Sequence, residues 1–495
     1  MRRFGPSALE AVVAVVCAVA LGASPALAST TAHKGETATP HRVGGRVHQA
    51  WPRGEGRPPR SALARWLARQ VGPTKARPCT KRAHGKVVTC HRRRAPRTGA
   101  PLSGGPLGGP RAHSIRALEG TMDLGDDMNP IAFAASGSPA TTATTTSSDL
   151  QLVRSYAIPT DDPSYARLLN WSWTYDSAIT AAAFTVFGAT SEAQQLLDQL
   201  AALQHTDGSI EIAFNVSDGS TEPVFRSGTI ATMGLAGSLY DQRTQTSRYL
   251  SMEERAASYL MSLQGTNGNG LVRGGPDVGW YSTQHNLLAY AFLNQLGAEL
   301  TADGQRSTAN SYLTAANKIS SGLESKLLIQ NGSQAWFIEG LGDNVQSLDA
   351  DALGVLYLVS RNETTNAQKV LAYANSAFAV SGRSIAKSTA TGAYNNTYAA
   401  AGPFSGFKPF IGSGAPDVMW TEGSAEMVLA DLAAGQSSTA LDTSLLAISG
   451  LTPASGPLMA DRTVTNLAYS AEFHVWPSAA AGAWLILAAA HPTLF

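Results

Sequence analysis

The stretch PDVMWTEGSAEMVLA, from Pro416 to Ala430, joins a helix start to a run of apolar residues. Pro416 interrupts any regular structure before it, and Asp417 or Thr421 can cap the helix that follows. Beyond Glu422 nearly every face of this helix is apolar, which predicts that the helix is buried on all sides. Glu422 thus stands at the mouth of a buried helix, where a carboxylate either interacts with the helix N-terminus or takes part in chemistry.

The same arrangement recurs along the chain. Polar, aromatic-rich loops each lead into a strongly apolar helix, and a more amphipathic helix follows. Roughly 50 to 70 residues separate the starts of the apolar helices, which is the length of a helical hairpin with a long loop. The apolar helices are expected to begin near Tyr175, Ser227, Thr283, Leu348, Trp420 and Trp476.

These patterns predict an all-α fold, an (α/α)6 toroid that spans residues 149–495. Such a toroid needs an inner ring of helices that are apolar all round and an outer ring of helices with one apolar face. Two of the amphipathic helices end alike, in LQHTDGSI from Leu203 and LQGTNGNGL from Leu263, which predicts equivalent turns. An open helical solenoid is the alternative, but its repeats are normally shorter and more uniform.

Composition limits the class of protein. With 495 residues, 15% of them charged and 44% hydrophobic, the chain can bury a large core. The net charge of +1 hides an asymmetry, because residues 29–116 are rich in Lys and Arg and contain only two acids, Glu36 and Glu55. The remaining body is short of basic residues, which argues against a nucleic-acid partner and fits neutral polymers such as glycans.

Residues 1–28 are typical of a secretory signal peptide. Arg2 and Arg3 precede an apolar run, and Ala26-Leu27-Ala28 resembles a cleavage site. The apolar run is too short to span a bilayer comfortably. We therefore expect a secreted protein, with association with the cell surface left open, and no transmembrane segment in the mature chain.

Residues 29–148 form a basic leader and linker, rich in Pro and Gly, that is predicted to be mostly disordered. Cys79 and Cys90 are expected to form a disulfide after export and to close a local hairpin, with a zinc site as the weaker alternative. Residues 61–70 can form one short amphipathic helix. The leader could bind an anionic cell-surface polymer, although a solvated leader is the simpler interpretation.

In a toroid the loops that enter the inner helices gather at one end, so their residues should surround one cavity. Aromatic rings pack on the apolar faces of pyranoses, and carboxylates accept hydrogen bonds from sugar hydroxyls. The candidate catalytic residues are Glu422, Asp176, Asp349 and Glu472. The candidate substrate-binding residues are Trp173, Arg226, Tyr281, His285, Asn286, Trp420, His474 and Trp476.

The chain between Asn170 and Phe495 resembles the six-hairpin glycosidase superfamily. The resemblance rests on the motifs WTYDSAI, STQHNLLAY, LDADALGVL, VMWTEGSAE and HVWPSAAAGAW. It implies a secreted bacterial protein that acts on carbohydrate, with its cleft at the N-terminal ends of the inner helices and with an inverting mechanism. The chain does not match the catalytic signatures of the cellulase-type families on this fold, so the particular family stays open. Related chains often carry an acid at the position of Gln284, which weakens a catalytic role for the third hairpin.

A glycoside hydrolase needs one carboxyl that donates a proton and one carboxylate that activates water or attacks the sugar. We expect Glu422 to be the acid, since apolar neighbours can raise its pKa, and Asp176 to be the base, although Asp176 could instead cap its helix. Asp349 and Glu472 are the next candidates for the base. No cofactor and no metal site is predicted.

Two other functions fit the same scaffold. A polysaccharide lyase could use Tyr281, His285 and Arg226 to remove a proton beside a uronate carboxylate. A non-catalytic glycan-binding protein of the cell surface is the third interpretation.

Overall fold

The computed structural model describes residues 59–73, 80–83, 86–89, 149–160, 162–265, 269–343, 345–388, 399–451, 456–466, 471–490, 492 and 494–495. All of them belong to one compact unit, Gly56–Phe495. The predicted signal peptide, Cys79 and Cys90 lie outside the described residues, so the signal and the disulfide stay predictions. No helix in the described part of the chain is long and apolar enough to cross a membrane.

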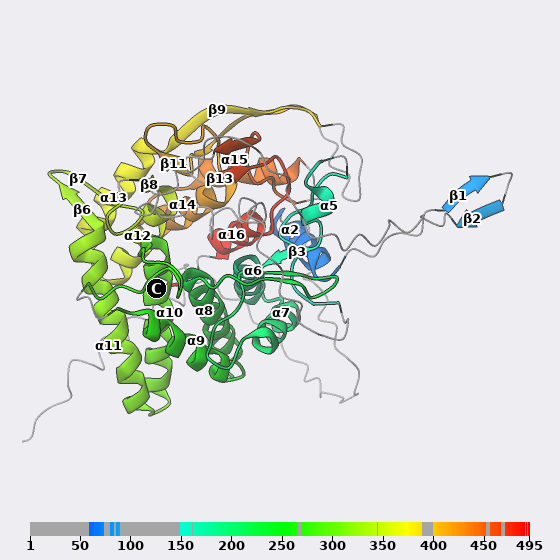
Figure 1. Cartoon of the computed structure of the whole chain (residues 1–495). Helices are drawn as coiled ribbons and strands as arrows, with labels where there is room; N and C mark the ends of the chain where they lie inside the picture. The colour runs from blue at the N-terminus through cyan, green and yellow to red at the C-terminus, as the bar shows by residue number, and fades with distance from the viewer. Residues whose placement is uncertain are drawn as a thin grey trace, which may run out of the picture. The chain divides into compact units, whose positions relative to one another are not determined.

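An inner ring of helices surrounds the axis of the domain (Figure 1). Each inner helix contacts the next one along the chain, and the last contacts the first, so the ring closes. Helices of this kind are buried on every side, which is why their sequences are apolar all round. The described residues contain six of them: α6 (Thr174–Phe187), α8 (Ser227–Thr244), α10 (Thr283–Ala302), α12 (Leu348–Ser360), α14 (Thr421–Ala433) and α16 (Ala479–Ala490).

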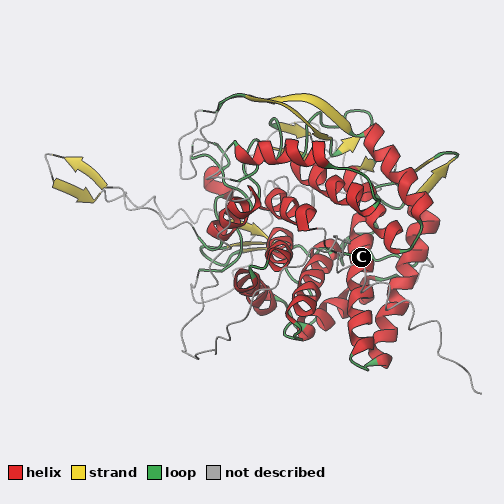
Figure 2. Cartoon of the chain, turned by 180° about the vertical axis from the view of Figure 1, so that it is seen from behind, coloured by secondary structure: helices red, strands yellow, loops and turns green. Residues whose placement is uncertain are grey.

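An outer ring of more amphipathic helices encloses the inner one, and Figure 2 shows both rings from behind. Each outer helix packs mainly against one inner helix. The pairs are α7 (Thr190–Leu203) with α6, α9 (Leu250–Leu263) with α8, α11 (Arg306–Gly322) with α10, α13 (Thr364–Ala377) with α12, α15 (Thr439–Gly450) with α14, and α2 (Pro59–Gln70) with α16. The expected (α/α)6 toroid is confirmed.

Helix α2 supplies the sixth outer position although it lies in the predicted leader. The side chains of Trp66 and Leu67 are buried, with exposures of 1% and 0%. The guanidinium of Arg154 donates to the carbonyl oxygens of Gln70 and Gly72, at 3.2 and 3.0 Å. It thus provides hydrogen-bond partners for carbonyl groups at the C-terminal end of α2. The domain therefore includes α2, which a start at residue 149 leaves out.

Short antiparallel strands lie in the loops. They are β3 (Trp171–Trp173), β4 (Ala213–Asn215) and β5 (Thr221–Glu222) in one sheet, and the pairs β6 (Leu328–Asn331) with β7 (Gln334–Phe337), β8 (Gln346–Ser347) with β11 (Phe410–Ile411), β9 (Ala379–Ile385) with β10 (Ala401–Phe407), and β12 (Val464–Asn466) with β13 (Ala471–Phe473). A hairpin of β1 (Thr80–Ala83) and β2 (Lys86–Thr89) lies between the positions of the two cysteines, as expected. A short helix, α5 (Tyr165–Leu168), and a π-helical turn, η2 (Leu323–Leu327), complete the described elements.

The inner helices begin in a closed belt of backbone hydrogen bonds. The first N–H groups of a helix have no partner inside the helix and must find one elsewhere. Here the first N–H of each inner helix donates to a carbonyl oxygen in the loop that leads to the next inner helix. The pairs are Thr174 to Ile212 (2.9 Å), Ser227 to Gly274 (2.8 Å), Thr283 to Glu339 (2.8 Å), Leu348 to Pro409 (2.9 Å), Thr421 to Met459 (3.0 Å) and Ala479 to Ser155 (2.9 Å). The N-terminal ends of all these helices therefore lie on one face of the ring.

This belt takes the place of the side-chain cap that the sequence predicts for α14. Trp420 is the N-cap residue and its side chain makes no capping bond. Asp417 instead accepts hydrogen bonds from the guanidinium of Arg383. The expected cap by Asp417 or Thr421 is thus corrected. At Gly423 a Cβ would lie 2.4 Å from the ring of Trp420, so the glycine leaves room for that ring.

The two similar turns after α7 and α9 have the same structural role. The amide of Gln204 donates to the carbonyl oxygens of Gly208 and of Met252 on α9, both at 3.1 Å. The amide of Gln264 donates in the same way to Gly270 and to Ala315 on α11, at 2.7 and 3.0 Å. Each turn therefore ties one outer helix to the next, and the predicted equivalence of the turns is confirmed.

Gly208→Ala is expected to destabilise the domain. Gly208 has a φ of +94°, and a Cβ there would lie 2.0 Å from the carbonyl oxygen of Arg255. We expect a loss of about 3 kcal/mol in the free energy of unfolding, measured by urea denaturation. Gly304→Ala is the matched control, because Gly304 has a φ of +80° and open space around it; it should lose about 1 kcal/mol. Equal losses would contradict the steric account.

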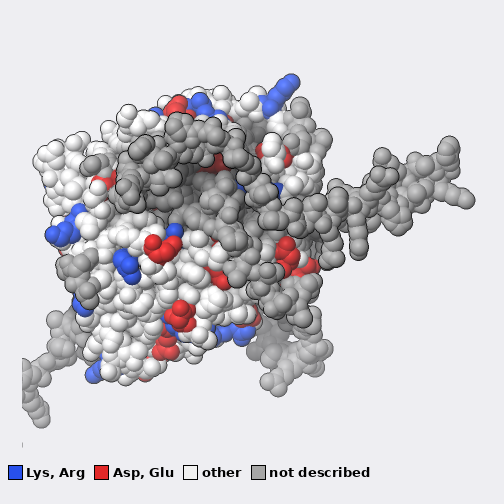
Figure 3. All heavy atoms as spheres, in the orientation of Figure 1, with Lys and Arg blue, Asp and Glu red and all other residues white. Residues whose placement is uncertain are grey.

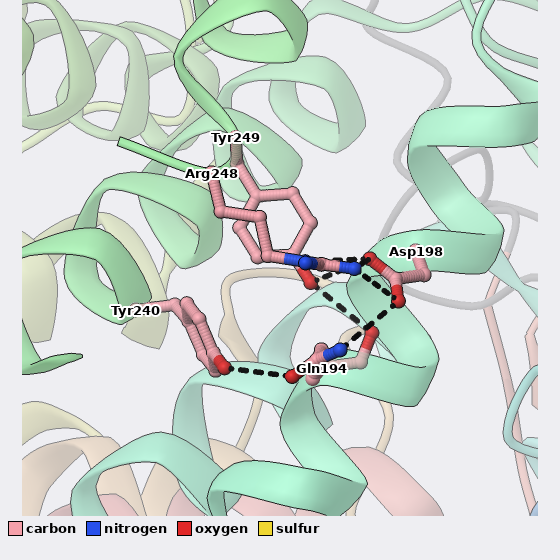
Figure 4. Close-up of polar contacts among 5 residues, drawn as sticks. All are labelled: Gln194, Asp198, Tyr240, Arg248 and Tyr249. Atoms are coloured by element: carbon pink, nitrogen blue, oxygen red, sulfur yellow. Dashed lines mark hydrogen bonds and ion pairs between the residues drawn. The ribbon is translucent and has the colours of Figure 1, made fainter. Parts of the chain in front are cut away.

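Charged residues are dispersed on the surface. On the face seen in Figure 3, Lys and Arg are interspersed with Asp and Glu among a majority of other residues. Some polar and charged side chains around outer helix α7 form ion pairs and hydrogen bonds (Figure 4). Arg248 donates to both carboxylate oxygens of Asp198, at 2.9 Å each, and the hydroxyl of Tyr249 donates to Asp198 at 2.9 Å. The hydroxyl of Tyr240 on α8 donates to Gln194 at 3.3 Å, so both α8 and the residues that follow it are fixed to α7.

Candidate active site

The candidate carboxylates lie at the N-terminal ends of inner helices. Glu422 is the second residue of α14, Asp349 the second of α12 and Asp176 the third of α6, while Glu472 lies on β13, shortly before α16. Burial raises the pKa of Tyr156, and so do the charges of Asp176, Glu422 and Glu472. Burial likewise raises the pKa of Glu422, and the charges of Asp176 and Asp349 add to the effect. Asp176 and Asp349 are therefore near Glu422, and Glu472 shares with Glu422 and Asp176 the neighbourhood of Tyr156.

Glu422 belongs to a directed hydrogen-bond chain. The indole Nε1 of Trp484 donates to the hydroxyl oxygen of Tyr175 at 2.9 Å, and this hydroxyl donates to Oε1 of Glu422 at 3.0 Å. Burial raises the pKa of Glu422 well above its usual value, with the hydrogen bond from Tyr175 opposing the shift. Glu422 nevertheless keeps partial solvent exposure. Its environment thus favours a protonated carboxyl that solvent can reach.

Glu472 has the opposite environment. His474 Nε2 lies 2.8 Å from Oε1 of Glu472, and this hydrogen bond holds the pKa of Glu472 below its usual value. The His474 ring stacks on Trp476 at a centroid distance of 3.6 Å, and Trp476 Nε1 donates to Asp162 at 3.0 Å. The Glu472 side chain is 21% exposed. It is therefore an ionised carboxylate in a fixed orientation that is accessible to water.

Asp176 and Asp349 are enclosed by the protein. Burial raises the pKa of Asp176 to about 7, against a hydrogen bond from Ser155. Burial also raises the pKa of Asp349 to about 6, and Oδ1 of Asp349 accepts a hydrogen bond from the backbone N–H of Ala350 at 2.9 Å. Their exposures are 3% and 0%, so both carboxyls are enclosed, whereas Glu422 and Glu472 keep partial exposure.

Two further residues near Glu422 were not among the sequence candidates. Tyr175 orients the carboxyl, and Glu426 lies one helical turn below it with 1% exposure. Neither oxygen of Glu426 has a hydrogen-bond partner among the described residues, and burial raises its pKa well above its usual value. The spacing of four residues, which places Glu422 and Glu426 on the same face of α14, is the sequence signal that could have identified Glu426.

The candidate stacking rings lie in the core. Trp173, Trp420 and Trp476 are each 3% exposed and Tyr281 is 8% exposed. Trp173, for example, packs against Tyr156 at a centroid distance of 6.0 Å. None of the four thus offers an open face to a sugar in this conformation, which corrects their expected role as stacking platforms.

Asn286 has a structural role, which corrects the expected contact with substrate. Its Oδ1 accepts from the N–H of Val272 at 2.7 Å, and its Nδ2 donates to the carbonyl oxygens of Val272 and Ser282. The fourth residue of three other inner helices accepts a backbone N–H in the same way. These bonds are Val153 to Ser177 (3.0 Å), Phe337 to Asp351 (2.6 Å) and Phe407 to Ser424 (2.9 Å). Asn286 therefore anchors the loop that precedes its helix.

Two other candidate residues, His285 and Arg226, are buried at the N-terminal ends of α10 and α8. His285 is 3% exposed and its Nδ1 lies 2.9 Å from the hydroxyl of Ser227. The guanidinium of Arg226 is buried and donates to Asp277 at 2.9 Å. His285 and Arg226 therefore lie at the N-terminal ends of α10 and α8, on the face that also carries the candidate carboxylates.

No protein-family model and no curated protein sequence matches the chain. Among solved structures, a wild-type glycosidase is similar with a TM-score of 0.51 and 14% identity, over 76% of this chain and 98% of that one. A glycosidase variant in complex with glucose is similar with a TM-score of 0.50 and 13% identity, over the same shares of the two chains. Likeness at this identity concerns the fold alone. The chain therefore shares the (α/α)6 toroid fold of these glycosidases.

Proposed function

We propose that the chain is a glycoside hydrolase in which Glu422 is the general acid and Glu472 the general base. One observation carries the proposal: two partly exposed carboxyls lie at the same end of the ring, with pKa values displaced in opposite directions. Hydrolysis of a glycoside requires this division between a protonated and an ionised carboxyl. Asp176, the base expected from the sequence, is less suitable because it is buried and its pKa is raised to about 7.

The hydrogen bond from Tyr175 determines which oxygen of Glu422 carries the proton. The Tyr175 hydroxyl accepts the N–H of Trp484 and donates its own proton to Oε1, so the carboxyl proton resides on Oε2. Oε2 then donates to the glycosidic oxygen as the bond to the anomeric carbon breaks. Glu472 takes a proton from the water that attacks this carbon, and inversion of configuration follows if the water attacks from the opposite side.

The substrate that we propose is an extracellular oligosaccharide or polysaccharide. The secretory signal predicted for residues 1–28 supports export, and the dispersed surface charges of the described residues fit a neutral glycan. A lyase is less well supported, because Arg226, its candidate for holding a uronate, is already paired with Asp277.

The test is a release assay on malto-, cello- and xylo-oligosaccharides and on uronate-containing polysaccharides. We expect new reducing ends with the wild type and almost none with Glu472→Gln. Proton NMR of the first-formed anomer tests inversion. An unsaturated product that absorbs in the ultraviolet would instead identify a lyase, and binding without turnover would identify a glycan-binding protein.

His474→Ala is expected to move the acidic limb of the pH profile of kcat/KM to higher pH. The hydrogen bond from His474 lowers the pKa of Glu472, so its loss leaves the base protonated over a wider range of acidic pH. His205→Ala is the matched control, because His205 also pairs with a glutamate, Glu211, at 3.0 Å. An unchanged acidic limb in His474→Ala would exclude Glu472 as the base.

A further inference from the structure

We propose that Trp280 and Asp277 form a sugar-binding subsite beside the carboxylates, in which the indole packs on the apolar face of a pyranose and Asp277 accepts hydrogen bonds from its hydroxyls. This inference rests on the proposed function for the class of ligand. The sequence placed Trp280 among the residues around the expected cavity but not among the candidate substrate-binding residues, and it did not single out Asp277.

The loop that carries these residues faces open space. Pro276, Asp277 and Gly279 are exposed, and a Cβ at Gly279 would meet no atom within 4 Å. Trp280 keeps partial exposure, in contrast to the four buried candidate rings. The loop leads directly into α10, so it lies on the face where the inner helices begin.

The indole of Trp280 is held in a fixed position. A Cβ at Gly274 would lie 1.8 Å from Cζ3 of Trp280, so the ring occupies the space where a side chain would be. The backbone of Gly274 is not in the left-handed region, and the missing side chain therefore serves the indole and not a turn. The N–H of Gly274 also donates to the carbonyl oxygen of Trp280 at 3.0 Å.

Two side chains complete the support of the ring. The guanidinium of Arg226 lies 5.7 Å from the centroid of the Trp280 ring, and the ring of His285 meets it edge-on at 5.3 Å. A ring that is already immobile loses little entropy when a ligand packs against it. Since His285 lies in the first turn of α10, the indole is held at the end of the ring where the candidate carboxylates also lie.

Asp277 provides the polar part of the subsite. Its Oδ1 accepts a hydrogen bond from the buried guanidinium of Arg226 at 2.9 Å, while its side chain is 58% exposed. The ion pair fixes the orientation of the carboxylate and leaves it open to solvent. An oriented carboxylate beside an aromatic ring is the combination that recognises a pyranose, with the ring taking the C–H face and the carboxylate the hydroxyls.

The test measures affinity and turnover separately. In the Glu422→Gln background, which suppresses hydrolysis, calorimetric titration with maltotriose, cellotriose and xylotriose gives Kd directly. We expect Trp280→Ala to weaken the best of these ligands about tenfold or more, and Trp280→Phe to retain part of the affinity. In the otherwise wild-type enzyme, Trp280→Ala should raise KM by a similar factor and leave kcat within about threefold.

Trp336→Ala is the matched control. Trp336 on β7 is also partly exposed, but its ring stacks on Tyr373 of outer helix α13 at 5.0 Å, so its loss should leave Kd and KM unchanged. Asp277→Asn keeps an oxygen that can accept from Arg226, so it should weaken binding with a smaller effect on stability than Trp280→Ala, and it covers the case in which Trp280→Ala does not fold.

The outcomes separate this inference from the proposed function. Unchanged Kd and KM in both Trp280→Ala and Asp277→Asn would overturn the subsite and leave the hydrolase intact. Binding that depends on Trp280 in a protein without hydrolytic activity would support the subsite and reject the hydrolase. Absence of binding of all three trisaccharides to the parent protein would reject the subsite as proposed.

Discussion

Glu422→Gln is expected to lower kcat on natural glycosides by about a thousandfold, since general acid catalysis contributes roughly 10²–10⁴ to such reactions. The amide has no proton to give to the leaving oxygen. The hydrogen bond from Tyr175 can still be accepted by the amide oxygen, so the side chain should keep its orientation. Reducing-end assays over the full pH range provide the measurement.

The reason for the loss can be tested with the leaving group. An aryl glycoside whose phenol leaves without protonation should lose far less activity in Glu422→Gln than an oligosaccharide does. Burial already favours a neutral group at position 422, so the variant should unfold at the same temperature as the wild type or higher. Equal losses on both substrates in a folded variant would remove Glu422 from the role of acid.

Trp66→Ala is expected to reduce the free energy of unfolding by about 3–5 kcal/mol, the usual cost of emptying the site of a buried Trp. The Trp66 ring covers Gly456 and Gly482, where an added Cβ would lie 2.3 and 3.3 Å from it. Its removal leaves a cavity between α2 and α16, and α16 is apolar on every face. Urea denaturation followed by circular dichroism gives the free energy.

The control for this prediction is Arg65→Ala, on the same helix at a partly exposed position. It should change the free energy of unfolding by less than about 0.5 kcal/mol. If Trp66→Ala were as mild as the control, α2 would not be an integral part of the ring, and the start of the domain expected at residue 149 would be correct.

The inner helices could be predicted because the sequence of each one, taken alone, indicates that it is buried. Helices such as α12 and α16 are apolar on every face, and only the middle of a ring accommodates that pattern. The position of α2 could not be predicted in this way. It carries a narrow apolar stripe in a strongly basic, Pro-rich stretch, and its partner α16 lies at the other end of the chain.

For the candidate site too, local features could be predicted from the sequence and features that depend on distant segments could not. Carboxyls at helix starts, such as Glu422 and Asp349, can be read from the sequence because the helix start is a local feature. Exposure is not local, as it depends on loops from distant hairpins. Trp280 and Tyr281 are neighbours in the chain, yet the first keeps partial exposure and the second is buried. The choice of stacking rings therefore required the structure.

The belt of backbone hydrogen bonds has a consequence for how the domain comes apart. In a linear array of repeats the end units have a single neighbour and fray first. Here the link from Ala479 to Ser155 joins the last inner helix to the loop that leads into the first. Each repeat is therefore hydrogen-bonded to a neighbour on both sides. Unfolding of any one repeat breaks two of these backbone hydrogen bonds at once. Because the ring of repeats is closed, no end repeat can unfold first. We therefore expect the domain to unfold in a single cooperative transition.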